Sequence, residues 1–289
     1  MNSRPSTQSS AQPPDPSHGP HQAVDSSDEL PPAASVLGVE EVPLQAAEES
    51  DVDVLVVGAH PDDVEIACGG TLARLATQGY RVGIIDLTNG EPTPGCDDPR
   101  IREAEAARAA ETLGIAFRKI LPLTNRRLFD SFETRVALAT EFRRYRPRIV
   151  IGFGGKTPMA SPDHYQAMLI TDAAVFYSRL TKWDEYFGGL PVHTIHCQLY
   201  FQLGFEPLRS PDYNSQITVD ITPQLDTKLS SILCYATQFP PERRSIIDRV
   251  RGLAVSAGAA AGFGAGEVFS TTRPLGCSDL VRAVLPSDE

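Results

Sequence analysis

The sequence predicts an α/β protein with a Rossmann-like, doubly wound fold, in which helices cover both faces of a mostly parallel sheet. Two observations predict this fold class. Continuous apolar runs rich in β-branched residues, typical of strands buried on both faces, recur along the chain. Each of the first four runs is followed by a stretch of helical spacing, and such alternation is the pattern of doubly wound α/β proteins.

The predicted elements follow one another regularly up to about residue 190. Gly79 and Gly114 end the first two helices, and Ser131 opens the third, which stops before Pro147. Strands alternate with helices at 53–60, 61–79, 81–87, 101–114, 117–123, 131–147, 148–154 and 163–180. The less regular remainder is expected to hold two strands and then two helices, at 194–205, 215–222, 223–239 and 241–260.

Two glycine-rich stretches have structural explanations. Gly69 and Gly70 lie inside the first predicted helix, where glycine is unfavourable, and they indicate close packing against the sheet. The stretch 262–266 has the glycine content of a dinucleotide-binding loop but lacks the buried strand that should precede it. It therefore predicts a flexible loop.

The chain divides by composition into a tail and one domain. Residues 1–50 are rich in Ser, Pro, Gln and acidic residues, and they predict a disordered acidic tail. The net charge is −11, of which −7 falls in the tail (one basic and eight acidic residues) and −4 in residues 51–289. A near-neutral domain matches nucleic acid and anionic membranes poorly. We therefore expect neither as a partner, and we assign residues 51–289 to a single domain.

The lack of a recognisable secretory or transmembrane segment and the spacing of the cysteines favour a cytoplasmic protein. No stretch reaches the roughly 18 apolar residues that a transmembrane helix needs, and the N-terminus lacks the apolar core of a secretory signal. The five cysteines are widely spaced and form no Cys-x-x-Cys pair. They predict reduced thiols rather than a disulfide framework or a zinc ribbon.

Candidate ligands follow two of the predicted strands. His60, Asp62 and Asp63 come directly after the first strand, and Asp163 and His164 follow the strand 148–154. In open parallel sheets, ligands bind outside the carboxyl ends of the strands. Two imidazoles and one carboxylate suit a catalytic zinc or iron ion, so His60, Asp63 and His164 are candidate metal ligands. Asp62 remains free to act as a general base.

Each of these residues also has a structural explanation. A histidine at a strand end is commonly a hydrogen-bonding residue of the core. Adjacent aspartates in the first turn of a helix stabilise its dipole. The occurrence of both groups at the same predicted edge of the sheet favours the metal site.

The stretch from Val57 to Glu91, with Ala-His-Pro-Asp-Asp and the following Glu-x-x-x-Gly-Gly-Thr-Leu, strongly resembles the LmbE-like, PIG-L-type N-acetylglucosaminide deacetylases. The resemblance covers about residues 53–270. It implies a doubly wound fold and metal-dependent hydrolysis of the acetamide of a small GlcNAc conjugate, with Zn²⁺, or Fe²⁺, as cofactor. It also implies His60, Asp63 and His164 as ligands and Asp62 as the general base.

A second part of the motif points to substrate contacts. Asn89-Gly90-Glu91, followed by Arg102-Glu103-Ala104-Glu105, resembles the family's Thr-x-Gly-Glu loop and its Arg-x-x-Glu-Ala helix start. The resemblance implies Arg102, Glu91 and Asp163 as substrate-binding residues. Arg102 suits capture of a carboxylate or phosphate, and a solvated charge on a helix surface is the alternative.

The stretch 174–202 is most similar to the bacillithiol-pathway deacetylases, which act on N-acetylglucosaminyl malate. The family usually has His-Pro-Asp-His where this chain has Ser161-Pro162-Asp163-His164, so its first histidine is absent. His193, His196 or Lys156 are the candidate replacements. A different N-acyl substrate, or a metal-binding module with impaired catalysis, are the alternatives. Oligomeric state stays open, although the aromatic segment near 175–205 would suit a homo-oligomer contact.

Overall fold

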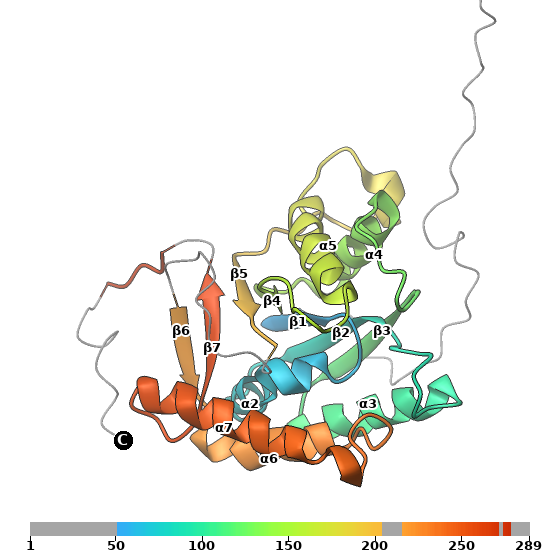
Figure 1. The fold of residues 1–289 in the computed structure, drawn as a ribbon. Helices are drawn as coiled ribbons and strands as arrows, with labels where there is room; N and C mark the ends of the chain where they lie inside the picture. The colour runs from blue at the N-terminus through green and yellow to red at the C-terminus, as the bar shows by residue number, and fades with distance from the viewer. Residues whose placement is uncertain (1–50, 204–215, 272–273, 279–289) are drawn as a thin grey trace, which may run out of the picture. The chain divides into compact units, whose positions relative to one another are not determined.

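The computed structural model describes residues 51–203, 216–271 and 274–278 (Figure 1). The predicted disordered tail, residues 1–50, lies outside the described residues. The described chain forms one seven-stranded sheet with the order β3-β2-β1-β4-β5-β7-β6. Its strands are β1 Val54–Gly58, β2 Val82–Thr88, β3 Phe117–Leu123, β4 Ile149–Phe153, β5 Cys197–Phe201, β6 Gln216–Asp220 and β7 Gly266–Thr271.

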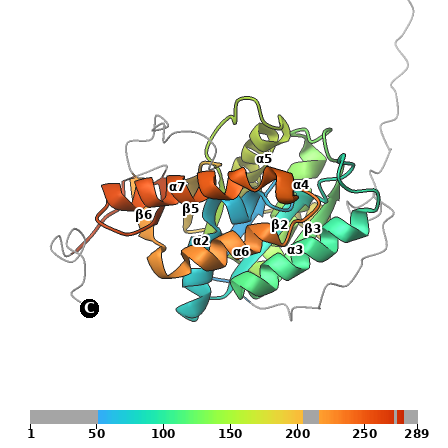
Figure 2. The ribbon, with the colours of Figure 1, turned by 60° about the horizontal axis from the view of Figure 1, so that its bottom comes forward.

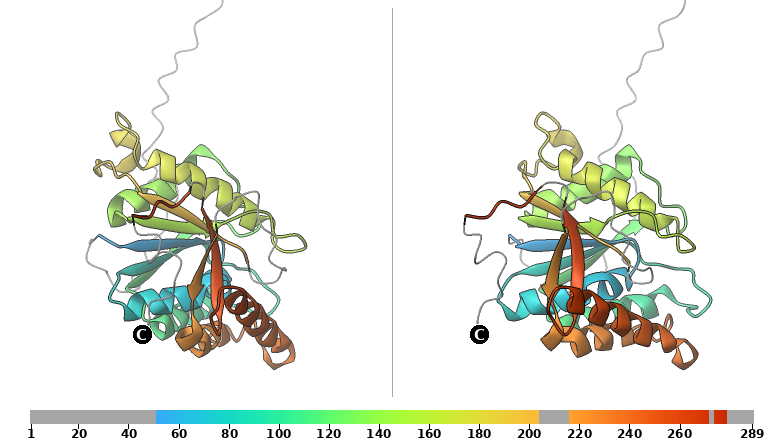
Figure 3. Two further views of the ribbon diagram at one scale, coloured as in Figure 1. Left: turned by 90° about the vertical axis from the view of Figure 1, so that its left-hand side faces the viewer. Right: turned by 60° about the vertical axis from the view of Figure 1, so that its left-hand side comes forward.

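The sheet is mostly parallel, as predicted. The pairs among β1 to β5 are all parallel, whereas β7 pairs antiparallel with both β5 and β6. β1 and β2 are buried along their whole lengths, which is why their sequences are continuous apolar runs rather than alternating ones. Beyond β5, the strands β6 and β7 turn steeply away from the direction of β1 (Figure 3).

Helices cover both faces of the sheet, which confirms the predicted fold class. One face carries α4 and α5, which pack against each other, and the other carries α2, α3, α6 and α7 (Figures 1 and 2). The helices are α2 Asp63–Thr77, α3 Pro99–Leu113, α4 Phe132–Tyr145, α5 Asp163–Tyr177, α6 Leu225–Leu233 and α7 Ser245–Ala260. Among the described residues, no helix combines the length and the apolar character needed to cross a membrane.

The predicted helix boundaries have local causes that the structure confirms. Ser131 caps α4 in a capping box, accepting a hydrogen bond from the Thr134 backbone N–H while the Thr134 hydroxyl bonds back to the Ser131 N–H. Gly114 ends α3 with φ of 68°, a left-handed conformation that glycine adopts without strain. α3 begins at Pro99, two residues before its predicted start, with the Asp98 side chain accepting from Arg100 N.

The strand order reverses between β1 and β4. From β1 the chain builds outward through β2 and β3 on one side, and from β4 through β5 on the other. β1 and β4 are adjacent and parallel, with Val54 opposite Ile149 and Val56 opposite Ile151. The segments that follow these two strands therefore leave the same edge of the sheet, at the kind of switch point where α/β proteins bind ligands.

The C-terminal third differs from the prediction at two places. The helix predicted over 223–239 ends at Leu233, and turns follow it. The prediction missed β7 altogether; of the loop predicted over 262–266, residues 262–265 lie in a turn and bends, but Gly266 is the first residue of β7. β7 lacks a clear local signature because its position depends on contacts with distant residues. A side chain at Gly266 would meet Thr218 of β6 and the backbone of Gly258 in α7.

The glycine pair in α2 has a different cause from the predicted one. A Cβ at Gly70 would lie 2.7 Å from Ile221 Cδ1, so this glycine permits contact with the segment after β6 and not with the sheet. Helix α2 is also interrupted at Cys68, whose φ of −145° and ψ of 21° are not helical.

The interruption of α2 exposes two backbone N–H groups, and a carboxylate of β7 accepts hydrogen bonds from both. Glu267 accepts from Gly70 N at 3.0 Å and from Thr71 N at 2.7 Å. Lys228 of α6 forms a buried ion pair with the same carboxylate and donates to Ile66 O. These contacts join the C-terminal part of the chain to the helix that begins at Asp63.

We expect Glu267→Gln to lower the free energy of unfolding by about 3 kcal/mol, because it leaves the Lys228 ammonium buried without a counter-charge. Urea unfolding followed by circular dichroism measures this change. Asp226→Asn is the matched control, because Asp226 pairs with Arg251 at the surface, where such pairs contribute less than about 1 kcal/mol. Equal effects of the two substitutions would contradict the assigned role of Glu267.

Candidate metal centre

Three side chains from two segments converge at the switch point. His60 follows β1, Asp63 is the first residue of α2, and His164 is the second residue of α5. Each offers one ligand atom, and these atoms lie within 4.8 Å of one another. Asp63 stands between the two imidazoles: Oδ2 is 3.3 Å from His60 Nδ1, and Oδ1 is 3.3 Å from His164 Nε2.

The imidazole of His164 is held on two sides. Its Nδ1 lies 2.7 Å from Thr157 Oγ1, and its ring stacks on Phe153 with the centroids 4.8 Å apart and the planes 14° apart. Phe153 is the last residue of β4, so the sheet itself orients the ring. Nε2 is consequently directed toward Asp63.

Asp163 supports the other imidazole. Its Oδ2 lies 3.4 Å from His60 Nε2 and accepts a hydrogen bond from Arg126 N at 2.6 Å. The Asp163 backbone N–H donates to the Ser161 hydroxyl at 3.3 Å. Carboxylate contacts of this kind orient histidine rings in metal sites.

The charges in the cluster depend strongly on one another. Burial disfavours the ionised carboxyl of Asp63, but His164 and His60 outweigh it and hold the Asp63 pKa well below its usual range. Burial likewise disfavours a charged His60, but Asp163 and Asp63 outweigh it and raise the His60 pKa to about 10. A carboxylate between two imidazoles, all three buried, is a donor set that fits zinc or iron(II).

Asp62 adopts a conformation that is costly for a residue with a side chain. Its φ of 116° lies in the left-handed region, where non-glycine residues carry a strain of about 1–3 kcal/mol. Its side chain makes no hydrogen bond that caps α2. Such strain at the residue between two candidate ligands is typical of functional sites.

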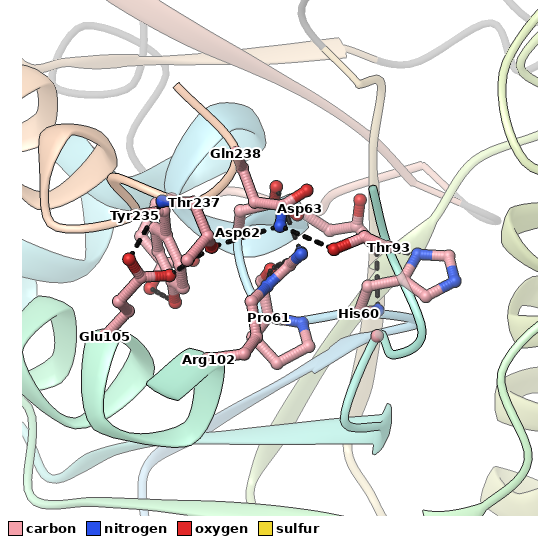
Figure 4. A network of polar contacts seen from close by, with 12 residues as sticks. His60, Pro61, Asp62, Asp63, Thr93, Arg102, Glu105, Tyr235, Thr237 and Gln238 are labelled. Carbon is pink, nitrogen blue, oxygen red and sulfur yellow. Dashed lines mark hydrogen bonds and ion pairs between the residues drawn. The ribbon is translucent and has the colours of Figure 1, made fainter. Parts of the chain in front are cut away.

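Arg102 of α3 holds the Asp62 carboxyl in place (Figure 4). Its Nη2 lies 3.3 Å from Asp62 Oδ2, its Nη1 lies 3.6 Å from Glu91 Oε1, and its Nε donates to Pro61 O at 3.2 Å. Burial raises the pKa of Asp62 to about 8 although Arg102 acts in the opposite direction. The site thus has a carboxyl whose pKa lies near neutrality beside a cluster of metal-ligand type.

These side chains open onto a cavity of about 340 Å³, a size that fits a sugar-like small molecule. The polar part of its wall includes three arginines and two side-chain amides. The lining residues are His60, Asp62, Asp63, Ile66, Gly90, Thr93, Arg102, Asn125, Arg126, Ala160, Ser161, His164, Leu203, Gln238, Phe239, Arg243 and Ile246.

The structure brings most of the predicted site residues together. The three candidate ligands, Asp62 and Arg102 all line the cavity, whereas Glu91 and Asp163 lie behind its wall. Glu91 accepts hydrogen bonds from Thr93 and faces Arg102. Their contacts are with residues of the wall.

Two predicted replacements for the absent histidine are wrong. His193 Nε2 donates to Pro147 O at 2.7 Å, and His196 N donates to Arg148 O. Both acceptors precede β4, so these histidines lie at the opposite edge of the sheet, about 16 Å away along a five-residue strand. The third candidate, Lys156, lies at the correct edge, but it places its ammonium over the Tyr165 ring and does not line the cavity.

Several residues of the wall were not predicted from the sequence. Asn125 and Arg126 follow β3, whose carboxyl end lies at the same edge of the sheet as those of β1 and β4. Gln238 and Arg243 follow α6, where the sequence predicted a continuous helix and a separate one. Asn125 and Arg126 could have been predicted, because polar residues directly after a parallel strand lie at the ligand-binding edge of the sheet. No comparable sequence signal marks Gln238 and Arg243.

Comparison with known proteins places the chain in a family. Residues 55–175 match the family described as PIG-L, GlcNAc-PI de-N-acetylase. A diacetylchitobiose deacetylase from Thermococcus kodakarensis is 30% identical over 200 residues, which are 65% of this chain and 71% of that protein. The chain belongs to the PIG-L family.

Further relatives support the fold of this PIG-L protein and widen the chemistry of its family. A conserved protein of known structure from Thermus thermophilus is 32% identical, with a TM-score of 0.68 over 78% of this chain and 97% of that chain. A 4-oxalmesaconate hydratase from Pseudomonas putida is 26% identical over 200 residues, 64% of this chain and 73% of that protein. One relative is thus named for deacetylation and another for hydration. The choice between these two reactions for this chain must therefore be argued from the residues of its site.

We expect Asp63→Ala to lower bound metal at least tenfold, because it removes the carboxylate between both imidazoles. Asp62→Asn is the matched control and should keep wild-type metal content. Elemental analysis of the purified, zinc-loaded proteins measures both. Loss of metal from Asp62→Asn would show that Asp62 is itself a ligand.

Proposed function

We propose that this PIG-L protein is a metal-dependent deacetylase that hydrolyses the N-acetyl group of a GlcNAc conjugate. The observation that carries the proposal is the Asp62 carboxyl, strained and half-buried, with a pKa that desolvation raises to about 8, beside the buried cluster of His60, Asp63 and His164. A purely structural metal site needs no such carboxyl. The names of the family and of the diacetylchitobiose deacetylase supply the acetylated sugar as the substrate class.

His60, Asp63 and His164 would hold the ion, with Zn²⁺ as the first choice and Fe²⁺ as the second. When bound, the ion supplies Lewis acidity, which polarises an amide carbonyl and makes water more acidic. Asp163 keeps the His60 ring oriented, and Thr157 and Phe153 do so for His164. In this proposal Asp163 acts on the substrate only through His60.

Asp62 is the general base and then the acid. Arg102 engages Oδ2, so Oδ1 is the oxygen that accepts a proton as water attacks the acetyl carbon. The carboxyl then returns this proton to the sugar nitrogen as the C–N bond breaks, and acetate and a free amine leave. A carboxyl with a pKa near neutrality can do both, because neither protonation state is strongly disfavoured.

The conjugate carries a carboxylate in this proposal, with N-acetylglucosaminyl malate as the first candidate. Arg126 and Arg243 line the cavity together with Arg102, and neither Arg126 nor Arg243 has an ion-pair partner within 51–203, 216–271 and 274–278. Planar guanidinium groups suit bidentate capture of carboxylates. Glu91 contributes by holding Arg102, 3.6 Å away.

Ser161 supports a second candidate, a metal-binding protein with impaired catalysis. Its hydroxyl lines the cavity where the family usually has a histidine, and it cannot carry a positive charge. Removal of a group that stabilises developing charge lowers rates by about two to three orders of magnitude. A slow enzyme and a binding protein differ in turnover, which the following measurement reports.

We expect purified, zinc-loaded protein to release free amine from N-acetylglucosaminyl malate and to lose this activity when a chelator removes the ion. Fluorescamine labelling of the amine measures the rate, with diacetylchitobiose as the neutral comparison substrate. A preference for diacetylchitobiose would contradict the anionic conjugate and keep the deacetylase. No release from either substrate, with metal still bound, would favour the binding protein.

We expect Asp62→Asn to lower kcat by about 10² to 10⁴, since the amide cannot accept the proton from water. The same amine assay measures kcat, and metal analysis shows whether the ion is retained. A reduction below threefold with metal in place would contradict the role of Asp62 as the base.

A further inference from the structure

The side-chain amide of Gln238 is held at the cavity wall by two threonines (Figure 4). Its nitrogen Nε2 lies 3.1 Å from Thr93 Oγ1 and 3.1 Å from Thr237 Oγ1. Thr93 belongs to the loop after β2, whereas Thr237 is the neighbour of Gln238 in the turns after α6. The amide thus joins two segments that are far apart in the sequence.

Each of the two threonine hydroxyls uses its single proton in a hydrogen bond to a carboxylate. Thr93 Oγ1 donates to the Glu91 carboxylate at 3.0 Å, and Thr237 Oγ1 donates to Glu105 Oε2 at 2.5 Å. A hydroxyl has a single proton, and a carboxylate only accepts. Each hydroxyl can therefore only accept from Gln238, so the amide must present its N–H₂ group to them.

The two carboxylates fix the threonines firmly enough for this constraint to hold. Glu105 Oε1 also accepts from Thr237 N at 2.9 Å, and Glu91 Oε2 accepts from Thr93 N. Glu105 lies one turn after Arg102 on α3, and both are buried. The Arg-x-x-Glu pair of α3 consequently has two roles here, since Arg102 holds Asp62 while Glu105 holds the segment that carries Gln238.

The orientation of the amide leaves its carbonyl oxygen as an acceptor. Within the part of the chain that the structure describes, no group donates to Gln238 Oε1. It is not among the fully buried polar atoms without a partner, so it remains accessible. Gln238 lines the same cavity as Asp62 and His60.

We propose that Gln238 is a specificity-determining residue whose Oε1 accepts a hydrogen bond from a sugar hydroxyl of the substrate. The inference rests on the proposed deacetylase function and adds a polar contact from a segment beyond residues 55–175, the part that matches the family. A locked acceptor discriminates more sharply than a mobile one, because it cannot rotate to offer its N–H₂ group to a ligand that lacks the hydroxyl.

The test compares the N-acetylglucosaminide with its 3-, 4- and 6-monodeoxy analogues on wild type and on Gln238→Met. Methionine keeps the length of the side chain and removes the acceptor. We expect wild type to lose about 2- to 13-fold in kcat/KM on one analogue, the range of a single neutral hydrogen bond. Gln238→Met should process that analogue and the parent equally well, and the lost preference should appear mainly in KM.

Three further measurements separate this role from a structural one. Metal content should match wild type in Gln238→Met, and its melting temperature should fall by only a few degrees, because two hydrogen bonds of the side-chain amide are lost. The exposed Gln78→Met should leave kcat/KM on all four substrates unchanged. Thr93→Val removes one of the hydroxyls that orient the amide and should weaken the preference without abolishing it. Full preference in Thr93→Val would overturn the orientation argument.

The outcomes distinguish the inference from the function on which it rests. The role of Gln238 would be overturned, and the deacetylase function would stand, if Gln238→Met lowered kcat/KM equally on the parent and all three analogues. Retention by this variant of the wild-type preference for the parent over one analogue would have the same meaning. If zinc-loaded wild type releases amine from none of the four, the deacetylase itself fails, and the inference fails with it.

Discussion

The parallel pairing of β1 with β4 is the constraint on which the site depends. Its register places Val56 opposite Ile151, so the two strands end at one edge of the sheet. The segment after β1 carries His60 and Asp63, and the segment after β4 leads to His164. From β1 the chain continues to β2 on one side of this pair, and from β4 it continues to β5 on the other side. The two connecting segments therefore diverge and leave a crevice between them, in which a polar cluster can form.

Buried charges stabilise the helix that carries two of these residues. Arg118 of β3 forms ion pairs with Glu65 of α2 and Asp86 of β2, and the Tyr235 hydroxyl donates to Glu65 at 2.8 Å. Burial raises the pKa of Asp86 to about 6 although Arg118 opposes it. Charges so deeply buried tolerate little displacement, since any shift leaves an uncompensated charge. They thereby hold the start of α2, where Asp62 adopts its strained conformation.

The C-terminal third of the chain completes the site through long-range contacts. Glu267 of β7 accepts from the interrupted turn of α2, and Glu105 of α3 accepts from Thr237 after α6. These two carboxylates connect the N-terminal α/β layers to segments that lie outside the residues matching the family. The candidate metal cluster lies within residues 55–175, which match the family, whereas Gln238 and Arg243 lie outside that range.

The sequence alone was sufficient to predict the α/β class, the first four strand–helix pairs and the residues of the candidate metal cluster. It could do so because both-face burial, helix caps and the Ala-His-Pro-Asp-Asp motif are local signals. The three-dimensional structure was needed to show that His193 and His196 lie at the opposite edge of the sheet from the cluster, and that Gly70 faces Ile221. It also decided where β7 and Gln238 lie, because their positions depend on contacts more than a hundred residues apart in the chain, which no local pattern records.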